Sequence, residues 1–266
     1  MSNMRLTILG CGSSGGVPRI GGHWGLCDPE NPKNTRRRCS VLIERFGDGG
    51  TTKVLVDTSP DLRQQLLDAR VGRLDGVVFT HSHADHVHGI DDLRMVVFNM
   101  RERLNVWAAT ETRADLENRF SYVFRQPEGS SYPPILNMQD LGTKTIIEGP
   151  GGPISFVPFE VDHGAIHMVG LRIADLVYLP DVAKLPPAAW DHLKDLDVWI
   201  VDALRRDPHP THSHLEQTLG WIEKVAPKHA VLTNMHIDLD YETVRAETPD
   251  SVEPAFDGMR IEFDHP

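Results

Sequence analysis

The chain has 266 residues and a formal net charge of −11, with 40% apolar and 24% charged residues. This composition is ordinary for a globular protein, and an acidic surface repels a phosphate backbone, so a nucleic-acid partner is not expected. No apolar run approaches the ~20 residues of a membrane span, and the N-terminus lacks the pattern of a secretory signal. The three cysteines are widely spaced and favour a reducing cytoplasm. We expect residues 1–266 to form a single domain.

The first predicted elements are a strand over residues 6–9 and a glycine-rich loop over residues 10–18. Such a loop either brings its backbone close to a phosphate or makes a tight turn. We favour the turn, because no helix follows as a dinucleotide site would require. Residues 40–44 and 53–56 predict a hairpin, and Ser59, followed by a proline, predicts the N-cap of a helix.

The densest group of metal-binding side chains comes directly after residues 76–79, a predicted buried strand. It consists of His81, His83, Asp85 and His86. Ligand sites in α/β proteins gather at the carboxyl ends of strands. Imidazole nitrogens and carboxylate oxygens bind zinc and other first-row metals. The sequence therefore predicts a metal site here in preference to a polar surface loop.

The remainder of the chain alternates between predicted helices and strands. Residues 126–152 are rich in Pro, Gly and Ser, and we expect them to form a loop between two halves of the fold. Helices are predicted over residues 91–103, 112–124, 187–196 and 214–225, the last with Ser213 and Glu216 as a capping box. Strands are predicted over residues 104–108, 154–161, 168–173, 176–179, 198–201, 230–233 and 259–263.

Other polar side chains also lie where predicted strands end. His163, Asp181 and His236 each closely follow an apolar strand, and we predict that they complete two metal sets. In this interpretation Asp181 lies between the metals. One set is His81, His83 and His163, and the other is Asp85, His86 and His236. Asp57 and Asp202 also end strands, and we expect them to orient ligand histidines.

The His-x-His-x-Asp-His motif, followed by a lone histidine, a lone aspartate and a lone histidine, resembles the metallo-β-lactamase superfamily. The resemblance implies an α/β fold, a four-layer αββα sandwich, with the metals at the rim where two sheets meet. Five stretches also resemble the branch that contains phosphoribosyl 1,2-cyclic phosphate phosphodiesterase: GCGSSGGVP, VDTSPDLR, THSHADHVHGIDDLR, YLPD and LTNMHIDLDY. In that branch the histidine at the position of His212 is taken as the general acid.

The chain departs from that branch at two places. Asn234 stands at the position of the last ligand histidine, and His236 follows two residues later. The branch also holds a structural zinc on a Cys-x-Cys-x-x-Cys run and a late histidine. Here only Cys27 remains of that run, and Ile237 stands at the late histidine, so we do not expect this zinc.

We therefore expect a hydrolase with two divalent metal ions, zinc or manganese, that opens a small cyclic or diester phosphate such as a ribose cyclic phosphate or a nucleotide. Two such metals activate a water molecule held between them. Asp85 is expected to act both as a ligand and in catalysis, and His212 to protonate the leaving alkoxide. A tRNA 3′-end processing ribonuclease and a non-catalytic metal- or nucleotide-binding sensor are the alternatives. The sequence is also compatible with a homodimer.

Overall fold

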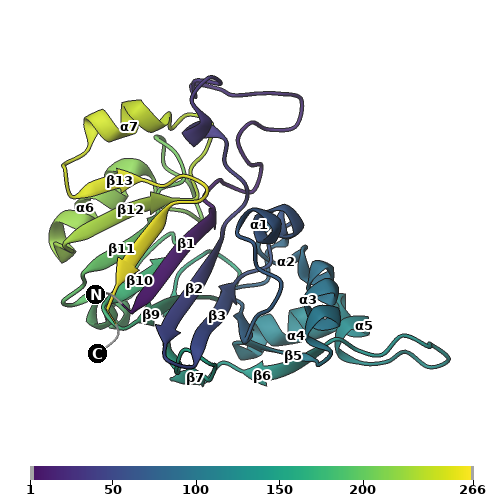
Figure 1. Cartoon of the computed structure of the whole chain (residues 1–266). Helices are drawn as coiled ribbons and strands as arrows, with labels where there is room; N and C mark the ends of the chain where they lie inside the picture. The colour runs from purple at the N-terminus through teal and green to yellow at the C-terminus, as the bar shows by residue number, and fades with distance from the viewer. Residues whose placement is uncertain (1–2, 265–266) are drawn as a thin grey trace.

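Two seven-stranded sheets pack face to face, and helices cover their outer sides (Figure 1). The computed structural model describes residues 3–264. In order across the first sheet, the strands are β14 (Arg260–Phe263), β1 (Met4–Gly10), β2 (Ser40–Gly47), β3 (Gly50–Val56), β4 (Gly76–Val78), β5 (Leu104–Ala108) and β6 (Leu136–Asp140). Across the second sheet they are β13 (Val252–Pro254), β12 (His229–Thr233), β11 (Val198–Asp202), β10 (Leu176–Leu179), β9 (Met168–Ile173), β8 (Ile154–Val161) and β7 (Thr145–Ile147).

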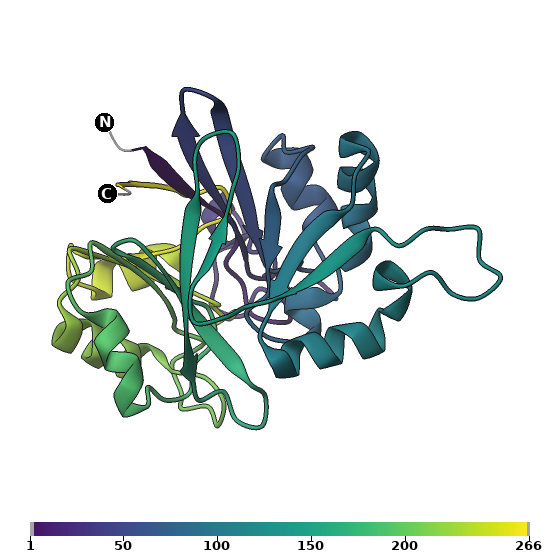
Figure 2. The ribbon, with the colours of Figure 1, turned by 90° about the horizontal axis from the view of Figure 1, so that it is seen from below.

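The helices follow the division of the chain into two halves, which Figure 2 shows from below. On the first sheet lie α1 (Leu62–Asp68), α2 (Ala84–Val87), η2 (Ile90–Asp92), α3 (Leu93–Met100), α4 (Thr110–Arg119) and α5 (Ser121–Phe124). On the second lie η3 (Pro187–Leu193), α6 (Leu215–Val225) and α7 (Tyr241–Glu247), and η1 (Pro32–Asn34) belongs to the excursion after β1. Helix, sheet, sheet and helix form the expected four-layer αββα sandwich.

The central strands are apolar throughout because both of their faces are buried. On β2, Ile43 belongs to the core between the sheets, whereas its neighbour Leu42 belongs to the core beneath the helices. Val54 and Leu55 on β3 divide in the same way. Successive side chains of a strand point to opposite faces, so a strand covered on both faces lacks the polar alternation of a half-exposed one.

Several predicted element boundaries were wrong for local reasons. The N-cap of α1 is Asp61, two residues after the predicted Ser59; the Ser59 hydroxyl accepts a hydrogen bond from the backbone nitrogen of Asp61, and the helix begins at Leu62. Ser213 does not form a capping box, because its hydroxyl donates to the backbone oxygen of Asp202. His214 is the N-cap of α6, without a side-chain hydrogen bond. In each case a nearby backbone group takes the hydroxyl that the helix terminus would use.

Six elements were missed: η1, α2 and four others, two of which lie inside the predicted loop 126–152. Strand β6 pairs in parallel with β5, and β7 pairs antiparallel with β8. Both are short sheet-edge segments: burial does not alternate along β6, and it alternates over only three residues in β7. The other two are β13, which pairs with β12, and α7, which packs against β13. Their sequences are polar and short, and tertiary contacts decide their structure.

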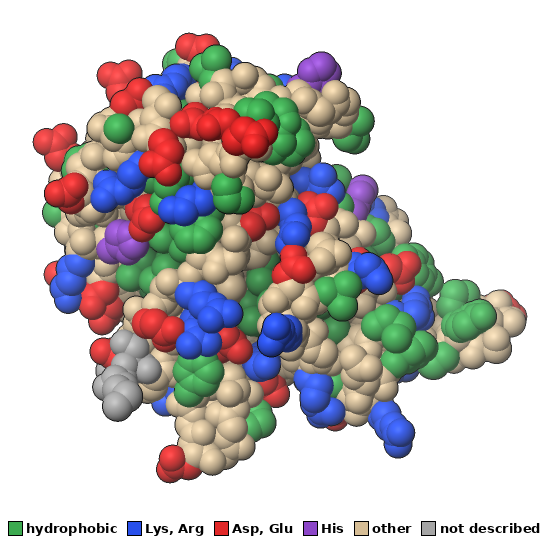
Figure 3. Space-filling model, turned by 45° about the horizontal axis from the view of Figure 1, so that its top comes forward, with side chains coloured by type: hydrophobic (Ala, Val, Ile, Leu, Met, Phe, Trp, Pro, Cys, Tyr) green, Lys and Arg blue, Asp and Glu red, His purple; other side chains and the backbone are tan. Residues whose placement is uncertain are grey.

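The surface carries both signs of charge close together. On the face shown in Figure 3, basic side chains are interspersed with acidic ones. A phosphate backbone is best bound by a continuous basic track, which an interspersed pattern does not provide. Within residues 3–264, no helix is long and apolar enough to cross a membrane.

Parallel pairing brings the carboxyl ends of strands from both sheets to one region. Strands β3, β4 and β5 are parallel in the first sheet, and β10, β11 and β12 are parallel in the second. The close approach at Gly89 helps to fix the loop after β4. Its nitrogen donates to the Thr58 oxygen at 2.9 Å, and a Cβ there would lie 2.0 Å from the backbone oxygen of Ser59.

We predict that Gly89→Ala lowers the free energy of unfolding by about 1–3 kcal/mol, because the added methyl group forces α2 away from the loop after β3. Gly220→Ala is the matched control. Nothing lies within 4 Å of a Cβ at Gly220, inside α6, so alanine there should stabilise the protein by about 0.5–1 kcal/mol. Urea denaturation of both variants checks the pair, and equal stabilities would contradict it.

Candidate metal centre

The first predicted metal set is brought together at the facing strand ends. One ligand atom from each of His81, His83, His163 and Asp181 lies within 4.8 Å of the other three. His81 Nε2 is 3.2 Å and His163 Nε2 is 3.4 Å from the same oxygen of Asp181, Oδ2. His163 Nε2 is also 3.1 Å from His83 Nδ1. Residues 80 positions apart in the chain thus converge on one carboxylate oxygen.

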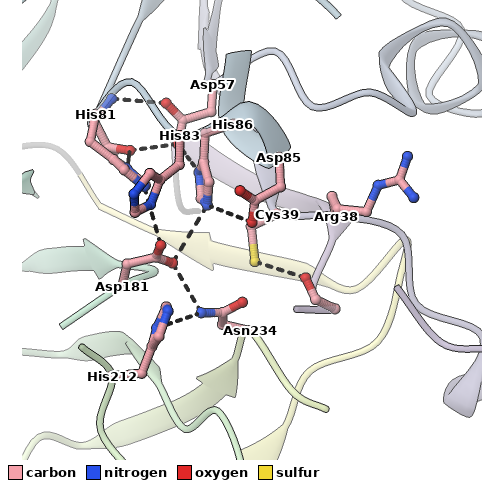
Figure 4. Close-up of polar contacts among 12 residues, drawn as sticks. Arg38, Cys39, Asp57, His81, His83, Asp85, His86, Asp181, His212 and Asn234 are labelled. Atoms are coloured by element: carbon pink, nitrogen blue, oxygen red, sulfur yellow. Dashed lines mark hydrogen bonds and ion pairs between the residues drawn. The ribbon is translucent and has the colours of Figure 1, made fainter. Parts of the chain in front are cut away.

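The protonation of His81 follows from its hydrogen bonds (Figure 4). The Thr80 hydroxyl donates its proton to Asp57 Oδ2 at 2.7 Å, so it accepts from His81 Nδ1 at 3.0 Å. His81 Nε2 therefore carries a lone pair and faces a carboxylate oxygen. This nitrogen is buried and has no hydrogen-bond partner in the part of the chain that the structure describes. A cation between Nε2 and Asp181 would remove the repulsion.

His163 has the same arrangement. Its Nδ1 lies 2.7 Å from the backbone oxygen of Thr211, which only accepts, so the ring proton is on Nδ1. Nε2 is again left with a lone pair directed at Asp181. Such contacts between a histidine and a backbone or carboxylate oxygen orient the rings of metal ligands. The donor set, three imidazoles and one carboxylate, fits a first-row metal such as zinc.

The other oxygen of Asp181 faces the second predicted set. His86 Nε2 lies 3.5 Å from Asp181 Oδ1 and 3.7 Å from Asp85 Oδ2, while His86 Nδ1 contacts Asp57 Oδ2 at 2.8 Å. His86 Nε2 is also buried without a hydrogen-bond partner among residues 3–264. Asp181 thus stands between the two sets, as a bridging carboxylate would.

Burial and nearby carboxylates shift the pKa values of the histidines in this centre. Burial lowers the pKa of His81 to about 3, and burial also lowers the pKa of His83 and His163. These rings are therefore neutral, which is the form that binds metals. Burial opposes a charge on His86 as well, but Asp181, Asp85 and Asp57 outweigh it and raise its pKa well above the usual value.

His212 approaches the centre from the second sheet. Its Nδ1 contacts Asp202 Oδ2 at 3.0 Å, and its ring packs edge-on against His163. Burial disfavours the charged ring, but the hydrogen bond and charge of Asp202, with Asp181 and Asp85, raise the pKa of His212 to about 9. Asp202 orients this ring, as predicted for a strand-end aspartate, but through His212 and not through a ligand of the first set.

The structure does not bring His236 to the other predicted ligands. Its Nδ1 contacts Asp238 Oδ1 at 2.9 Å, and its Nε2 contacts the Arg19 guanidinium. Asn234 lies nearer the centre, with its amide nitrogen 3.0 Å from Asp181 Oδ1. The role of His236 as a metal ligand stays a prediction, and in this geometry its ring contacts Arg19 and Asp238. The left-handed backbone at Asn234, with φ of 60°, directs residue 234 and not residue 236 at Asp181.

A polar cavity of about 300 Å³ opens beside these groups. Its wall is formed in part by Asp85, Asp181 and His212, which belong to the centre. The sequence did not single out the other charged lining residues, Arg19 and Arg205, because neither belongs to a recognisable motif. Lining side chains are Ser13, Ser14, Arg19, His83, Asp85, Asp181, Leu204, Arg205, His209, His212, Asn234 and His236.

Comparison with known proteins places this centre in a family. Residues 52–237, more than half of the chain, match the Beta-lactamase superfamily domain, and the chain belongs to that superfamily. Its fold is closely similar to the crystal structure of a diphosphatase from the PhnP family, with a TM-score of 0.86 and 35% identity over 98% of this chain and 97% of that one. The superfamily resemblance seen in the sequence is thereby confirmed.

More distant structures share the fold alone. Zn(2+)-bound PqqB from Methylobacterium extorquens has a TM-score of 0.74 at 18% identity, covering 97% of this chain and 100% of that one. The short form of human tRNase Z has a TM-score of 0.65 at 16% identity, covering 98% and 100%.

Among curated proteins, a Porphyromonas gingivalis protein named octanoyltransferase is 32% identical over 266 residues. That match covers 98% of this chain and 52% of the relative, so the chain spans about half of its length. Coenzyme PQQ synthesis protein B of Methylobacterium radiotolerans is 32% identical over 102 residues, which is 34% of each protein.

We predict that Asp57→Ala destabilises the protein by about 3 kcal/mol even when a chelator removes metals. Asp57 accepts from the nitrogen and hydroxyl of Thr80 and contacts His86, all in a buried setting, and its loss leaves these groups without partners. The exposed Asp140→Ala is the control and should change stability by less than about 0.5 kcal/mol. Denaturation in EDTA measures both, and equal values would show that Asp57 matters only through metal.

Proposed function

We propose that the protein is a metal-dependent phosphodiesterase acting on a small cyclic or diester phosphate. The observation that carries this proposal is the shared cavity, in which the cluster around Asp181 and the proton donor His212 both line the wall. A phosphate at the cluster would lie beside a group able to protonate its leaving oxygen. Divalent metals, zinc or manganese, would supply the activated water and neutralise charge on the phosphate.

We assign the ligands by the geometry of the two oxygens of Asp181. His81, His83, His163 and Asp181 would hold one metal, and Asp85, His86 and Asp181 would hold the other. Asp57, Thr80 and the backbone of Thr211 keep the ligand nitrogens unprotonated and aimed inward. Because of these contacts, the orientations of the histidine rings are fixed before the substrate binds.

His212 serves as the general acid in this scheme. Its hydrogen bond to Asp202 keeps Nδ1 protonated and leaves the opposite nitrogen, Nε2, free to give a proton to the departing alkoxide. A raised pKa keeps this ring in its acidic form at neutral pH. Asp85 lines the cavity as well, and we retain it as a ligand that also contacts the reacting phosphate region.

A diphosphate linkage is the second candidate for the bond that is broken, because the structurally similar PhnP-family protein is a diphosphatase. Acyl transfer is a weaker candidate despite the name of the P. gingivalis relative. An eight-carbon chain needs an apolar wall, and Leu204 is the one apolar lining residue among residues 3–264. A tRNA substrate is disfavoured by the net charge of −11.

We predict that the two metals are held unequally. The Asp85–His86 set has Asn234 where a further imidazole would complete it, so about one metal per chain should remain after dialysis, and Asn234→His should raise this to about two. Asn105→His, at an exposed position of β5, is the control and should add none.

Metal analysis of the dialysed proteins measures this effect. Asp181→Ala should retain no metal after dialysis, and retention of the wild-type amount would refute the bridging role. Two metals in the wild type, with one lost in His236→Ala, would restore His236 as a ligand and contradict the assignment of Asn234.

We predict that His212→Ala keeps its metals but loses about 10²–10⁴-fold of its activity on phosphodiesters with alkoxide leaving groups. Activity on bis(p-nitrophenyl) phosphate should fall much less, because nitrophenolate leaves without a proton. His214→Ala, two residues away and not on the cavity wall, should leave both rates unchanged. Steady-state rates on both substrates decide this, and equal losses would show that His212 binds phosphate without acting as the acid.

A further inference from the structure

The loop that carries His81 and His83 is held from outside by helix α4. Ser82, the residue between the two histidines, donates its hydroxyl proton to Asp115 Oδ2 at 2.6 Å. The backbone oxygen of Ser82 accepts a hydrogen bond from Arg119 Nη1, also at 2.6 Å. Two side chains of one helix therefore hold the hydroxyl and the carbonyl of a single loop residue.

These three residues, which we call the Ser82 clamp, connect a buried loop to the outer layer of the sandwich. Asp115 and Arg119 are four residues apart on α4, so they lie on the same face of the helix. They also contact each other, with Arg119 Nη2 3.4 Å from Asp115 Oδ2. Ser82 is buried, whereas the side chains of Asp115 and Arg119 reach the surface.

The Ser82 carbonyl depends on the clamp for its hydrogen bond. Within residues 3–264, no backbone nitrogen donates to this oxygen, although the next carbonyl along, that of His83, accepts from the His86 nitrogen at 3.0 Å. A buried carbonyl without a partner is unfavourable, and Arg119 supplies the missing donor. In doing so it fixes the peptide group between Ser82 and His83.

His83 differs from the other ligand histidines in how its ring is oriented. An oxygen atom holds the ring nitrogen that points away from the centre in His81, His86 and His163. Among the described residues, the hydrogen-bond contact of the His83 ring is with His163 Nε2, itself a predicted ligand atom. The position of the His83 ring therefore follows from its backbone, and the peptide group that begins at Ser82 sets that backbone.

We propose that Asp115 and Arg119 are positioning residues that orient His83 for metal binding from the outer helix layer. This inference rests on the metal centre of the proposed function and not on its substrate. Groups behind the ligands of a metal typically contribute about 10–100-fold to metal affinity. Without the donor of Arg119 the peptide group at Ser82 is free to rotate, and the His83 ring loses its fixed direction.

The test measures zinc affinity by competition with a chelator, on the full chain and without any substrate. We expect Arg119→Met to weaken the tightest zinc site by about 10–100-fold. Asp115→Ala should weaken the same site, whereas Asp115→Asn should stay close to the wild type, because it keeps an oxygen that accepts from the Ser82 hydroxyl.

Arg113→Met is the matched control. Arg113 lies on the same helix, is 43% exposed against 40% for Arg119, and forms its own ion pair with Glu117 at 3.1 Å. Its loss should leave zinc affinity unchanged. Denaturation in EDTA checks that each variant is folded before zinc is added, and the Asp115→Ala and Asp115→Asn pair decides the question if Arg119→Met does not fold.

A double-mutant cycle separates an effect on His83 from a general effect on the fold. His83→Ala removes the ring through which the clamp acts, so the addition of Arg119→Met should cause no further loss of zinc affinity. A further loss of about 10–100-fold in the His83→Ala background would show that the clamp acts on the whole fold, and it would overturn the inference.

The remaining outcomes distinguish this inference from the proposed function. Unchanged zinc affinity in Arg119→Met, or an equal loss in Arg113→Met, would overturn the role of the clamp and leave the phosphodiesterase intact. The expected affinities in a protein that hydrolyses no phosphodiester would support the clamp and refute the proposed function. A wild type that binds neither zinc nor manganese would refute both.

Discussion

The organising constraint of this molecule is the buried carboxylate of Asp181, whose two oxygens face imidazole nitrogens of three histidines. His81 and His163 approach one oxygen, and His86 approaches the other. At His81 and His163 an unshared nitrogen pair faces the carboxylate in a buried setting, and the two repel one another, so this arrangement is suited to a cation. Much of the nearby structure holds the three histidines close to this carboxylate. Asp57 and Thr80 fix ring protons on the far side, and the facing ends of two sheets supply the close approach.

The cavity beside this carboxylate is chemically divided. At the centre lie the groups that would hold metal and phosphate, with His212 set against Asp202 from the second sheet. Farther from it lie Arg19 and Arg205, on loops that the sheets do not fix directly. The loop with Arg19 is instead tied to residues 36–38 and to Met235 through backbone hydrogen bonds that glycine makes possible. The groups that would hold metal and phosphate therefore lie at strand ends, whereas the two arginines lie on loops attached to those strands.

Membership of the β-lactamase superfamily gives the fold and the class of chemistry, but one fold supports many reactions. Relatives named for a diphosphatase and an octanoyltransferase illustrate that breadth. What distinguishes this chain is local: Asn234 beside the shared carboxylate, His236 turned toward Arg19, and a cavity with almost entirely polar walls. These features favour a small anionic substrate over an acyl chain or a polymer.

The sequence alone determined the strand-terminal motif after β4, the two-sheet architecture and the order of the later ligand candidates, because buried strands and their polar ends leave a pattern within a few residues. It did not determine α7, β13 and the edge strands β6 and β7, whose short polar sequences adopt structure through neighbours. Nor did it distinguish Asn234 from His236, since the two lie in one turn and a single left-handed residue decides which faces Asp181. The pairing of Arg19 with a histidine 217 positions away was likewise beyond any local pattern, because only the folded chain brings the two together.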